Sequence, residues 1–177
     1  AEQTEGDLKA KGDTLTGTVR IAAGESHAFG SIARVMEAFR LENPHVTFAV
    51  HSGNAEDVSW RLDHGLADFS VFISYPNVGS YGHVRLSARD EFGLLVPASH
   101  PLAERKAIEP ADLLGISLIL PETTLESGPI ATWLGSMRDK VDRVATYSLA
   151  YNAAIMVREG LGCALVLDKI VPTGKKA

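Results

Sequence analysis

One stretch decides the fold of this chain, and it reads Met156-Val157-Arg158-Glu159-Gly160-Leu161-Gly162-Cys163-Ala164-Leu165-Val166. A helix is expected over 150–159, and it ends at Gly160 because glycine suits the left-handed backbone that closes many helices. The apolar run over 162–167 then predicts a buried strand. A helix leading directly into a buried strand is typical of α/β proteins, so we expect an α/β fold.

The same succession of elements occurs near the N-terminus. Apolar residues at alternating or helical spacing predict strands over 17–23, 46–51 and 69–73, with helices over about 28–41 and 54–65 between them. Short helical crossovers require parallel strands and right-handed connections. In such open sheets ligands bind at the carboxyl ends of the strands. Those ends are Gly24–His27, Ser52–Asn54 and Ser74–Tyr75.

The second half of the chain repeats this organisation. We expect strands over 91–96, 116–120, 141–147 and 162–167, and helices over 128–138 and 150–159. The sequence therefore predicts two lobes joined by two crossing segments that act as a hinge. Residues 1–15 would be a tail or the end of a linker. Lobe I would be discontinuous, comprising 16–88 and 166–177, and lobe II would comprise 89–165.

Composition and charge argue against several classes of protein. The formal net charge is −5 at pH 7, whereas proteins that bind nucleic acid tightly present a basic face. We therefore expect that this chain does not touch DNA itself. No apolar run approaches the roughly 20 residues of a membrane helix, and residues 1–15 lack a signal-peptide core. We expect a cytoplasmic protein without membrane contact.

Signatures of catalysis and of metal or cofactor binding are missing from the sequence. It contains neither a phosphate-binding GxxxxGK[ST] loop nor a GxSxG nucleophile turn. The six histidines are scattered, without the helical spacing of metal ligands. The single cysteine, Cys163, lies in an expected buried strand, which indicates an inert thiol. We expect no catalytic residue, no metal and no cofactor.

The two tryptophans are expected in different surroundings. Trp133 shares the apolar face of the helix over 128–138 with Ile130 and Leu134, which predicts a place in the core. Trp60 falls outside the line formed by Val58 and Leu62. We expect Trp60 at an interface between lobes or between subunits.

Motifs that match one known family occur in order from residue 15 to residue 170. They are Leu15-Thr16-Gly17-Thr18-Val19-Arg20-Ile21, Phe39 with Asn43-Pro44-His45-Val46, Gly53 with Leu62, Gly65, Ala67 and Asp68, then Ala98-Ser99-His100-Pro101-Leu102-Ala103, Asp112-Leu113 and 157–165. Each motif alone is a weak signal, but their order and spacing together are specific. The sequence resembles the effector-binding domain of LysR-type transcriptional regulators.

The resemblance implies two Rossmann-like lobes, as in type II periplasmic binding proteins, with a small-molecule effector held between them. It implies no enzymatic activity, a homodimer or homotetramer, and DNA contact only through an N-terminal winged helix-turn-helix that is absent here. The family usually continues a few dozen residues past a position like Val171, so we expect the C-terminal part of lobe I to be truncated. Organic acids are a common effector class, although Glu25 and Glu122 would place negative charge nearby.

Candidate effector contacts lie where the expected strands end. The Ser26 hydroxyl and the Asn54 amide each precede a helix, where either could bind an anionic group or serve as a plain N-cap. His27 is adjacent, and a place at the solvent edge is the simpler interpretation for it. Ordinary loop roles compete with effector contact for the remaining candidates. These are Ser74, Tyr75, Pro121, Thr123, Tyr147 and Ser148.

Two other functions use the same architecture and remain open alternatives. A free-standing solute-binding protein of a transporter would carry a signal peptide upstream, whereas a regulator would carry a helix-turn-helix. An enzyme on this two-lobed scaffold would turn over a metabolite. Because fold alone does not settle function, these alternatives need experiments.

Overall fold

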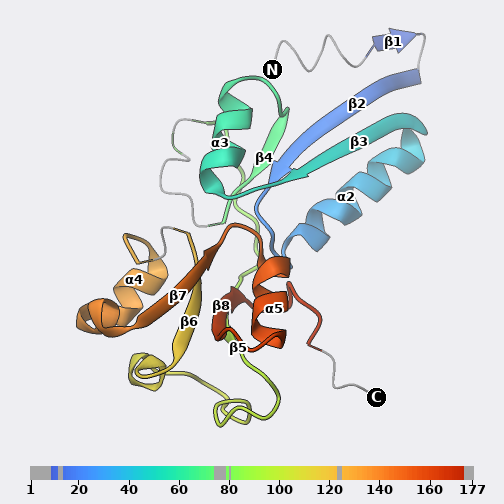
Figure 1. Cartoon of the computed structure of the whole chain (residues 1–177). Helices are drawn as coiled ribbons and strands as arrows, with labels where there is room; N and C mark the ends of the chain where they lie inside the picture. The colour runs from blue at the N-terminus through green and yellow to red at the C-terminus, as the bar shows by residue number, and fades with distance from the viewer. Residues whose placement is uncertain (1–8, 12–13, 74–78, 80, 123–124, 174–177) are drawn as a thin grey trace. The chain divides into compact units, whose positions relative to one another are not determined.

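The computed structural model in Figure 1 describes residues 9–11, 14–73, 79, 81–122 and 125–173. The chain divides into two compact units, Ala1–Arg89 and Asp90–Ala177. Each unit holds one sheet with helices packed against it, so the predicted α/β class is confirmed. The boundary between the units falls between Arg89 and Asp90.

The first unit is built around the long strand β2. In chain order its elements are β1 (Lys9–Lys11), β2 (Thr14–Ala23), α2 (Phe29–Glu42), β3 (His45–Ser52), α3 (Ala55–Asp63) and β4 (Phe69–Val71). Strands β3 and β4 both run parallel to β2, and β1 pairs with the start of β2 in the antiparallel sense. The predicted parallel strands with helical crossovers are therefore confirmed.

Helices α2 and α3 cover opposite faces of the first sheet. Helix α2 packs Phe29, Ile32 and Met36 on a cluster that contains Val19, Ile21 and Val46. Helix α3 packs Val58 against Ala22 and Ala67. Neighbouring residues of a strand point to opposite faces of the sheet. Ile21 therefore packs in the cluster under α2, and Ala22 packs in the cluster under α3.

A buried carboxylate joins β4 to β2. Asp68 is 4% exposed, and its Oδ2 accepts a hydrogen bond from the backbone N–H of Arg20 at 2.8 Å. Its Oδ1 lies 3.1 Å from Nη2 of the Arg20 guanidinium. The backbone N–H of Asp68 in turn donates to the Arg20 carbonyl at 2.8 Å. These contacts hold the start of β4 beside β2.

The strands of the second unit are connected in the same way as those of the first. Its elements are β5 (Phe92–Leu95), the 3₁₀ helix η2 (Pro110–Leu113), β6 (Ser117–Pro121), α4 (Pro129–Leu134), the 3₁₀ helix η3 (Gly135–Lys140), β7 (Asp142–Tyr147), α5 (Ala150–Arg158) and β8 (Cys163–Leu167). The strand order is β5-β8-β6-β7, with β6, β7 and β8 parallel and β5 antiparallel. As β2 does in the first unit, β6 lies between the two strands that follow it in the chain.

The stretch that predicted the fold takes the expected form. Helix α5 ends at Arg158, Gly160 has φ of +85°, and all five residues of β8 are buried. A Cβ atom at position 162 would lie 2.5 Å from the Ser117 carbonyl oxygen. Glycine at 162 therefore lets β8 enter the sheet directly beside β6.

Two apolar clusters flank the second sheet. Helix α4 contributes Ile130 and Leu134 to one cluster, which includes Leu118, Leu120, Cys163 and Leu165. Helix α5 contributes Ala150, Ala153 and Val157 to the other, which includes Ile119, Ala164 and Val166. Alternation along β6 and β8 assigns the two clusters to opposite faces.

Three expectations about single elements differ from the structure. The helix expected over 128–138 is α-helical only to Leu134, because Gly135 has φ of +53° and the chain continues as a 3₁₀ helix. Trp133 is 40% exposed, so its predicted place in the core is wrong. Part of the expected tail, Lys9–Lys11, forms strand β1.

The last described residues belong to the second unit, whereas the sequence placed everything from 166 onward in lobe I. In the structure β8 continues to Leu167, and Ile170 and Val171 pack on the cluster under α5. Strand β8 stays in the second sheet to its last residue, because Leu167 pairs with Phe92 of β5.

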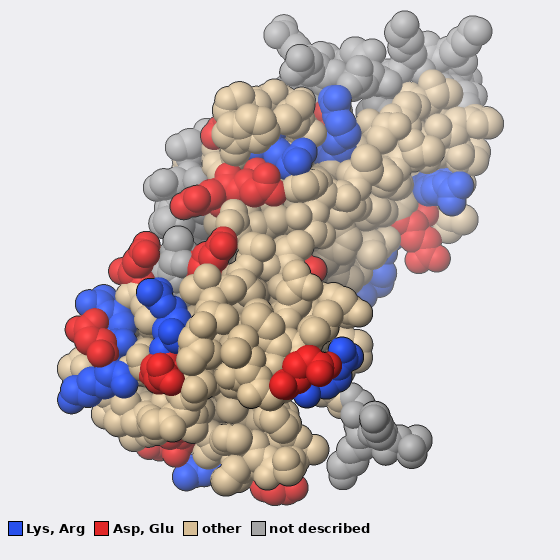
Figure 2. Space-filling view, viewed as in Figure 1, with Lys and Arg blue, Asp and Glu red and all other residues tan. Residues whose placement is uncertain are grey.

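Figure 2 shows acidic and basic side chains interspersed on the face in view. No helix among the described residues has the length and hydropathy to cross a membrane.

Candidate functional site

The carboxyl ends of three strands align at one edge of the first unit. Ala23 of β2 pairs with Ser52 of β3 and with Val71 of β4. The backbone N–H of Gly53 donates to the Ala23 carbonyl, and that of Gly24 donates to the Val71 carbonyl, both at 3.1 Å. The loops that carry Ser26 and Asn54 therefore leave neighbouring strand ends.

Ser26 closes the turn that begins α2. Its Oγ accepts from the Ala28 N–H at 2.9 Å, and its carbonyl accepts from the Phe29 N–H at 3.1 Å. The N–H groups of Gly30 and Ser31 donate to the carbonyls of residues 27 and 28. Four successive N–H groups, from 28 to 31, are thus bonded to oxygen atoms of the chain itself. His27, within this turn, is exposed.

Asn54 is the N-cap of α3. Its backbone is extended, with φ of −75° and ψ of 176°, and its Oδ1 accepts from the Asp57 N–H at 2.9 Å. The cap alternative for Asn54 is therefore realised. Contact between Asn54 and an effector stays a prediction, as it does for Ser26.

A cluster of ionisable side chains that the sequence did not reveal lies beside Asn54. The Asp57 carboxylate is 2.7 Å from Nε2 of His51 on β3 and 3.4 Å from Nε of Arg61 on α3. The available signal was an acidic residue three positions after an N-cap, the spacing of a capping box. Histidine at the end of a strand gives no such signal, because its partner is set by the fold.

Three of the predicted residues meet at the corresponding edge of the second unit. Pro121, the last residue of β6, pairs with Tyr147, the last residue of β7. The N–H of Glu122 donates to the Tyr147 carbonyl at 3.0 Å. Ser148 follows directly and is exposed. The strand ends that were predicted to carry these residues are confirmed.

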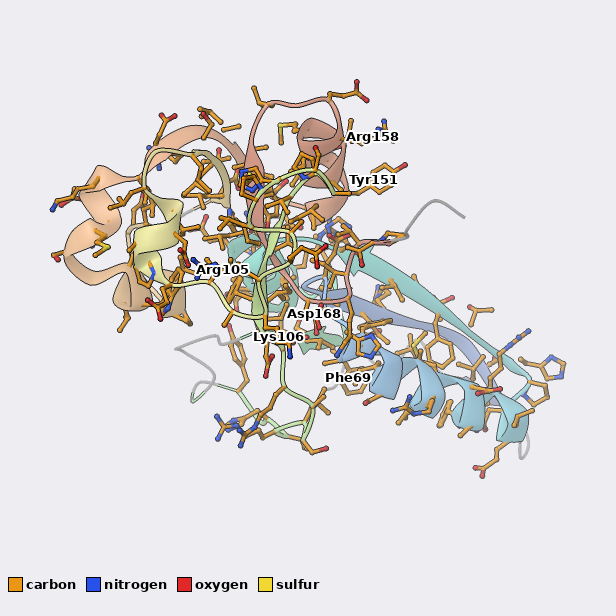
Figure 3. The ribbon with its side chains drawn as sticks, turned by 90° about the horizontal axis from the view of Figure 1, so that it is seen from below. Phe69, Arg105, Lys106, Tyr151, Arg158 and Asp168 are labelled. Carbon is orange, nitrogen blue, oxygen red and sulfur yellow. The ribbon has the colours of Figure 1, made fainter. Side chains whose placement is uncertain are left out.

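The Tyr147 side chain has a structural role. Its hydroxyl donates to the Leu165 carbonyl on β8 at 2.7 Å. Strands β6 and β8 pair only through Leu118 with Cys163 and Ile119 with Ala164, so they separate before Leu165. Tyr147 reaches across the end of β6 and bonds the Leu165 carbonyl where that strand no longer pairs with β8. Beyond β8, Asp168, which is labelled in Figure 3, lies 3.3 Å from Nζ of Lys169.

Three predicted contacts lie outside the described residues: Ser74, Tyr75 and Thr123. The described candidates form two groups, Ser26, His27 and Asn54 in the first unit and Pro121, Tyr147 and Ser148 in the second. The parts of the chain that the structure describes contain no group of three His, Cys, Asp or Glu side chains able to hold a metal ion.

Cys163 lies inside β8 and is buried. Burial raises the pKa of its thiol above the ordinary value. A raised pKa lowers the fraction of reactive thiolate at neutral pH, as expected for a cysteine that only packs.

Comparison with known proteins identifies the family. Residues 12–174 match the family described as the LysR substrate binding domain. A "Probable RuBisCO transcriptional regulator" of Cyanophora paradoxa is 28% identical over 110 residues, which are 58% of this chain and 32% of that protein. The chain thus spans about a third of the length of that relative and, at 34%, of its counterpart in Chlorokybus atmophyticus.

Solved structures share the fold. The oxidised form of OxyR superposes with a TM-score of 0.68 at 21% identity, over 92% of this chain and 76% of that one. The effector binding domain of QuiR in complex with shikimate superposes with a TM-score of 0.66 at 17% identity, over 86% of this chain and 74% of that one. Since the family match extends over nearly the whole sequence, this chain belongs to the LysR substrate-binding domain family.

Proposed function

We propose that this chain senses a small metabolite for a transcriptional regulator and passes the signal to a DNA-binding part of the whole protein. The observation that carries the proposal is the family match over residues 12–174. The relative in Cyanophora paradoxa is named a transcriptional regulator, and the QuiR domain was solved with shikimate bound. A ligand that prefers one of two arrangements shifts their populations, and this is how the signal would leave the domain.

The proposed effector contacts are the nine predicted residues. Alignment of the strand ends supports Ser26, His27 and Asn54 in the first unit and Pro121, Tyr147 and Ser148 in the second. Ser74, Tyr75 and Thr123 complete the set from the sequence. Contact of a single effector with both units stays a prediction of the family resemblance.

Hydrogen bonding at the start of α2 bears on the chemistry of the effector. A small organic acid stays the proposed class. The N–H groups of residues 28–31 already bond to the chain, so an incoming carboxylate would have to displace these bonds. We therefore propose that the acid group of the effector lies away from the first turn of α2. At the Ser26 loop, the effector would present a hydroxyl group.

The remaining features of the proposal concern the whole protein. We propose that it acts in the cytoplasm as a homodimer or homotetramer, without catalysis, and that a separate segment contacts DNA. Mixed charge on the face shown in Figure 2 supports DNA contact by a separate segment, because tight DNA binding needs a basic surface. Light scattering of this chain measures its oligomeric state. Mass spectrometry of incubated metabolite mixtures reports any turnover, which would favour the enzyme alternative.

A thermal-shift screen of metabolites tests the proposal. A ligand at 100 times its Kd adds about 2.7 kcal/mol to stability, which corresponds to roughly 5–11 °C in Tm for a chain of this size. Ser26→Ala and Asn54→Ala are each compared with their own ligand-free Tm, because loss of the Asn54 cap alone costs about 0.5–2 kcal/mol. Ser136→Ala, an exposed serine on η3, is the matched control. Equal ligand shifts in all four proteins would exclude both residues from the site.

A further inference from the structure

The loop between β3 and α3 is held by the carboxylate of Asp57. One oxygen of this carboxylate, Oδ2, lies 2.7 Å from Nε2 of His51, near the end of β3. The other, Oδ1, lies 3.4 Å from Nε of Arg61, one turn further along α3. Asp57 therefore connects the strand before the loop with the helix after it.

The backbone beneath Asp57 fits this arrangement. Gly53 is buried, and a Cβ atom there would collide with Oδ2 of Asp57 and lie 3.0 Å from its Cγ. The carboxylate thus packs directly over the Gly53 backbone. The Gly53 N–H donates to the Ala23 carbonyl, so the same residue fixes the loop to the central strand β2.

Asn54 lies between these two anchors. Its Oδ1 accepts from the N–H of Asp57, while the Asp57 side chain turns back to His51 and Gly53. The Asn54 side chain is therefore bonded to a residue whose own carboxylate contacts three others, His51, Gly53 and Arg61. Removal of the Asp57 carboxylate takes away those three contacts but leaves the N–H that Asn54 caps.

We propose that Asp57 is a positioning residue, which holds the Asn54 loop in the conformation that an effector contacts, with His51 and Arg61 holding the Asp57 carboxylate. This inference rests on the proposed function for the identity of the loop as an effector contact. The underlying geometry is a property of the first unit alone. It is therefore tested without any ligand, and its failure is distinct from a failure to find an effector.

The experiment compares variants of the 177-residue chain by ¹H–¹⁵N NMR. Asp57→Ala removes the carboxylate, and Asp57→Asn restores an oxygen that can accept from His51 and pack on Gly53. Glu56→Ala is the matched control, because it removes the same charge from the same turn of α3 and Glu56 is exposed. The readouts are the side-chain amide resonances of Asn54 and hydrogen exchange at the Asp57 N–H.

We expect Asp57→Ala to shift and broaden the Asn54 amide resonances and to speed exchange at the residue 57 N–H by up to about two- to thirtyfold, the range for full loss of a cap hydrogen bond. Asp57→Asn should restore most of the native resonance position. Glu56→Ala should leave both readouts unchanged. The proposal is overturned if Asp57→Ala leaves the Asn54 resonances in place, or if Glu56→Ala moves them equally.

A second pair of variants tests the contact with Gly53. Gly53→Ala places a methyl group where the carboxylate lies, so it should lower the Tm of the first unit. In an Asp57→Ala background that methyl group has room, and the further loss of Tm should be smaller. Equal losses of Tm in both backgrounds would show that Asp57 does not pack over Gly53, which also overturns the proposal.

Discussion

Removal of the buried Asp68 carboxylate should destabilise the first unit far more than removal of an exposed carboxylate would. Asp68→Ala deletes the acceptor for the Arg20 N–H and the partner of the Arg20 guanidinium, at 2.8 and 3.1 Å. A hydrogen bond to a charged group is worth about 1.5–3 kcal/mol. The ion pair adds only about 0–1 kcal/mol, because the Arg20 side chain is 35% exposed and water can solvate it. We expect a loss of about 2–4 kcal/mol from these two contributions.

The two tryptophans make this prediction measurable unit by unit. Trp60 lies in the first unit and Trp133 in the second. In a Trp133→Phe background, urea unfolding followed by fluorescence reports Trp60 alone. With a slope of about 2 kcal/mol per molar urea, Asp68→Ala should lower the midpoint by about 1–2 M.

The control is an exposed pair of the same chemical type. Asp139 is 85% exposed and lies 3.6 Å from Arg138 in the second unit, so its variant is measured in a Trp60→Phe background, where Trp133 is the reporter. Asp139→Ala should change stability by less than about 0.5 kcal/mol. If the two substitutions lower stability equally, burial does not strengthen the contacts of Asp68. That result would refute the reasoning behind the expected loss.

Three further substitutions or reagents test the second unit. Leu120→Ala deletes a side chain that is 0% exposed between β6 and α4, so it should cost about 2–5 kcal/mol in urea unfolding; a cost below about 1 kcal/mol would mean that the side chain is not packed as described. Tyr147→Phe removes the donor to the Leu165 carbonyl and should cost about 0.5–1.5 kcal/mol by the same assay, whereas unchanged stability would remove its structural role. Because burial raises the pKa of the Cys163 thiol, a thiol reagent at mildly alkaline pH should label it only on unfolding; rapid labelling of the folded chain would contradict this.

Most elements could be predicted because their signals are local. Apolar spacing found α2, α3 and α5 and every strand from β2 to β8 to within a few residues. The end of α4 was missed because Gly135 takes positive φ, and an isolated glycine in a helical pattern is often tolerated. Trp133 was also misplaced, because, of the residues in α4, only Ile130, Ala131 and Leu134 are buried.

Predictions for the candidate site reached the loops but not the side-chain contacts. Strand ends follow from periodicity, so the loops at Ser26, Asn54, Pro121 and Tyr147 were found. Which atoms these residues contact depends on segments far away in the sequence. The acceptor for the Tyr147 hydroxyl is 18 residues further on, where β6 and β8 separate.

The amino-acid sequence alone established an α/β protein with two units, without local signatures of catalysis or metal binding, because periodicity, glycine breaks and motif order are readable over short windows. Folding in three dimensions was needed to join Asp68 to Arg20 across 48 residues, to bring His51 onto Asp57, and to pack Ile170 and Val171 on the second unit. These contacts depend on strand register and on the space left beside glycine. Both are set only once the sheet has formed, so neither can be read from a short window of sequence.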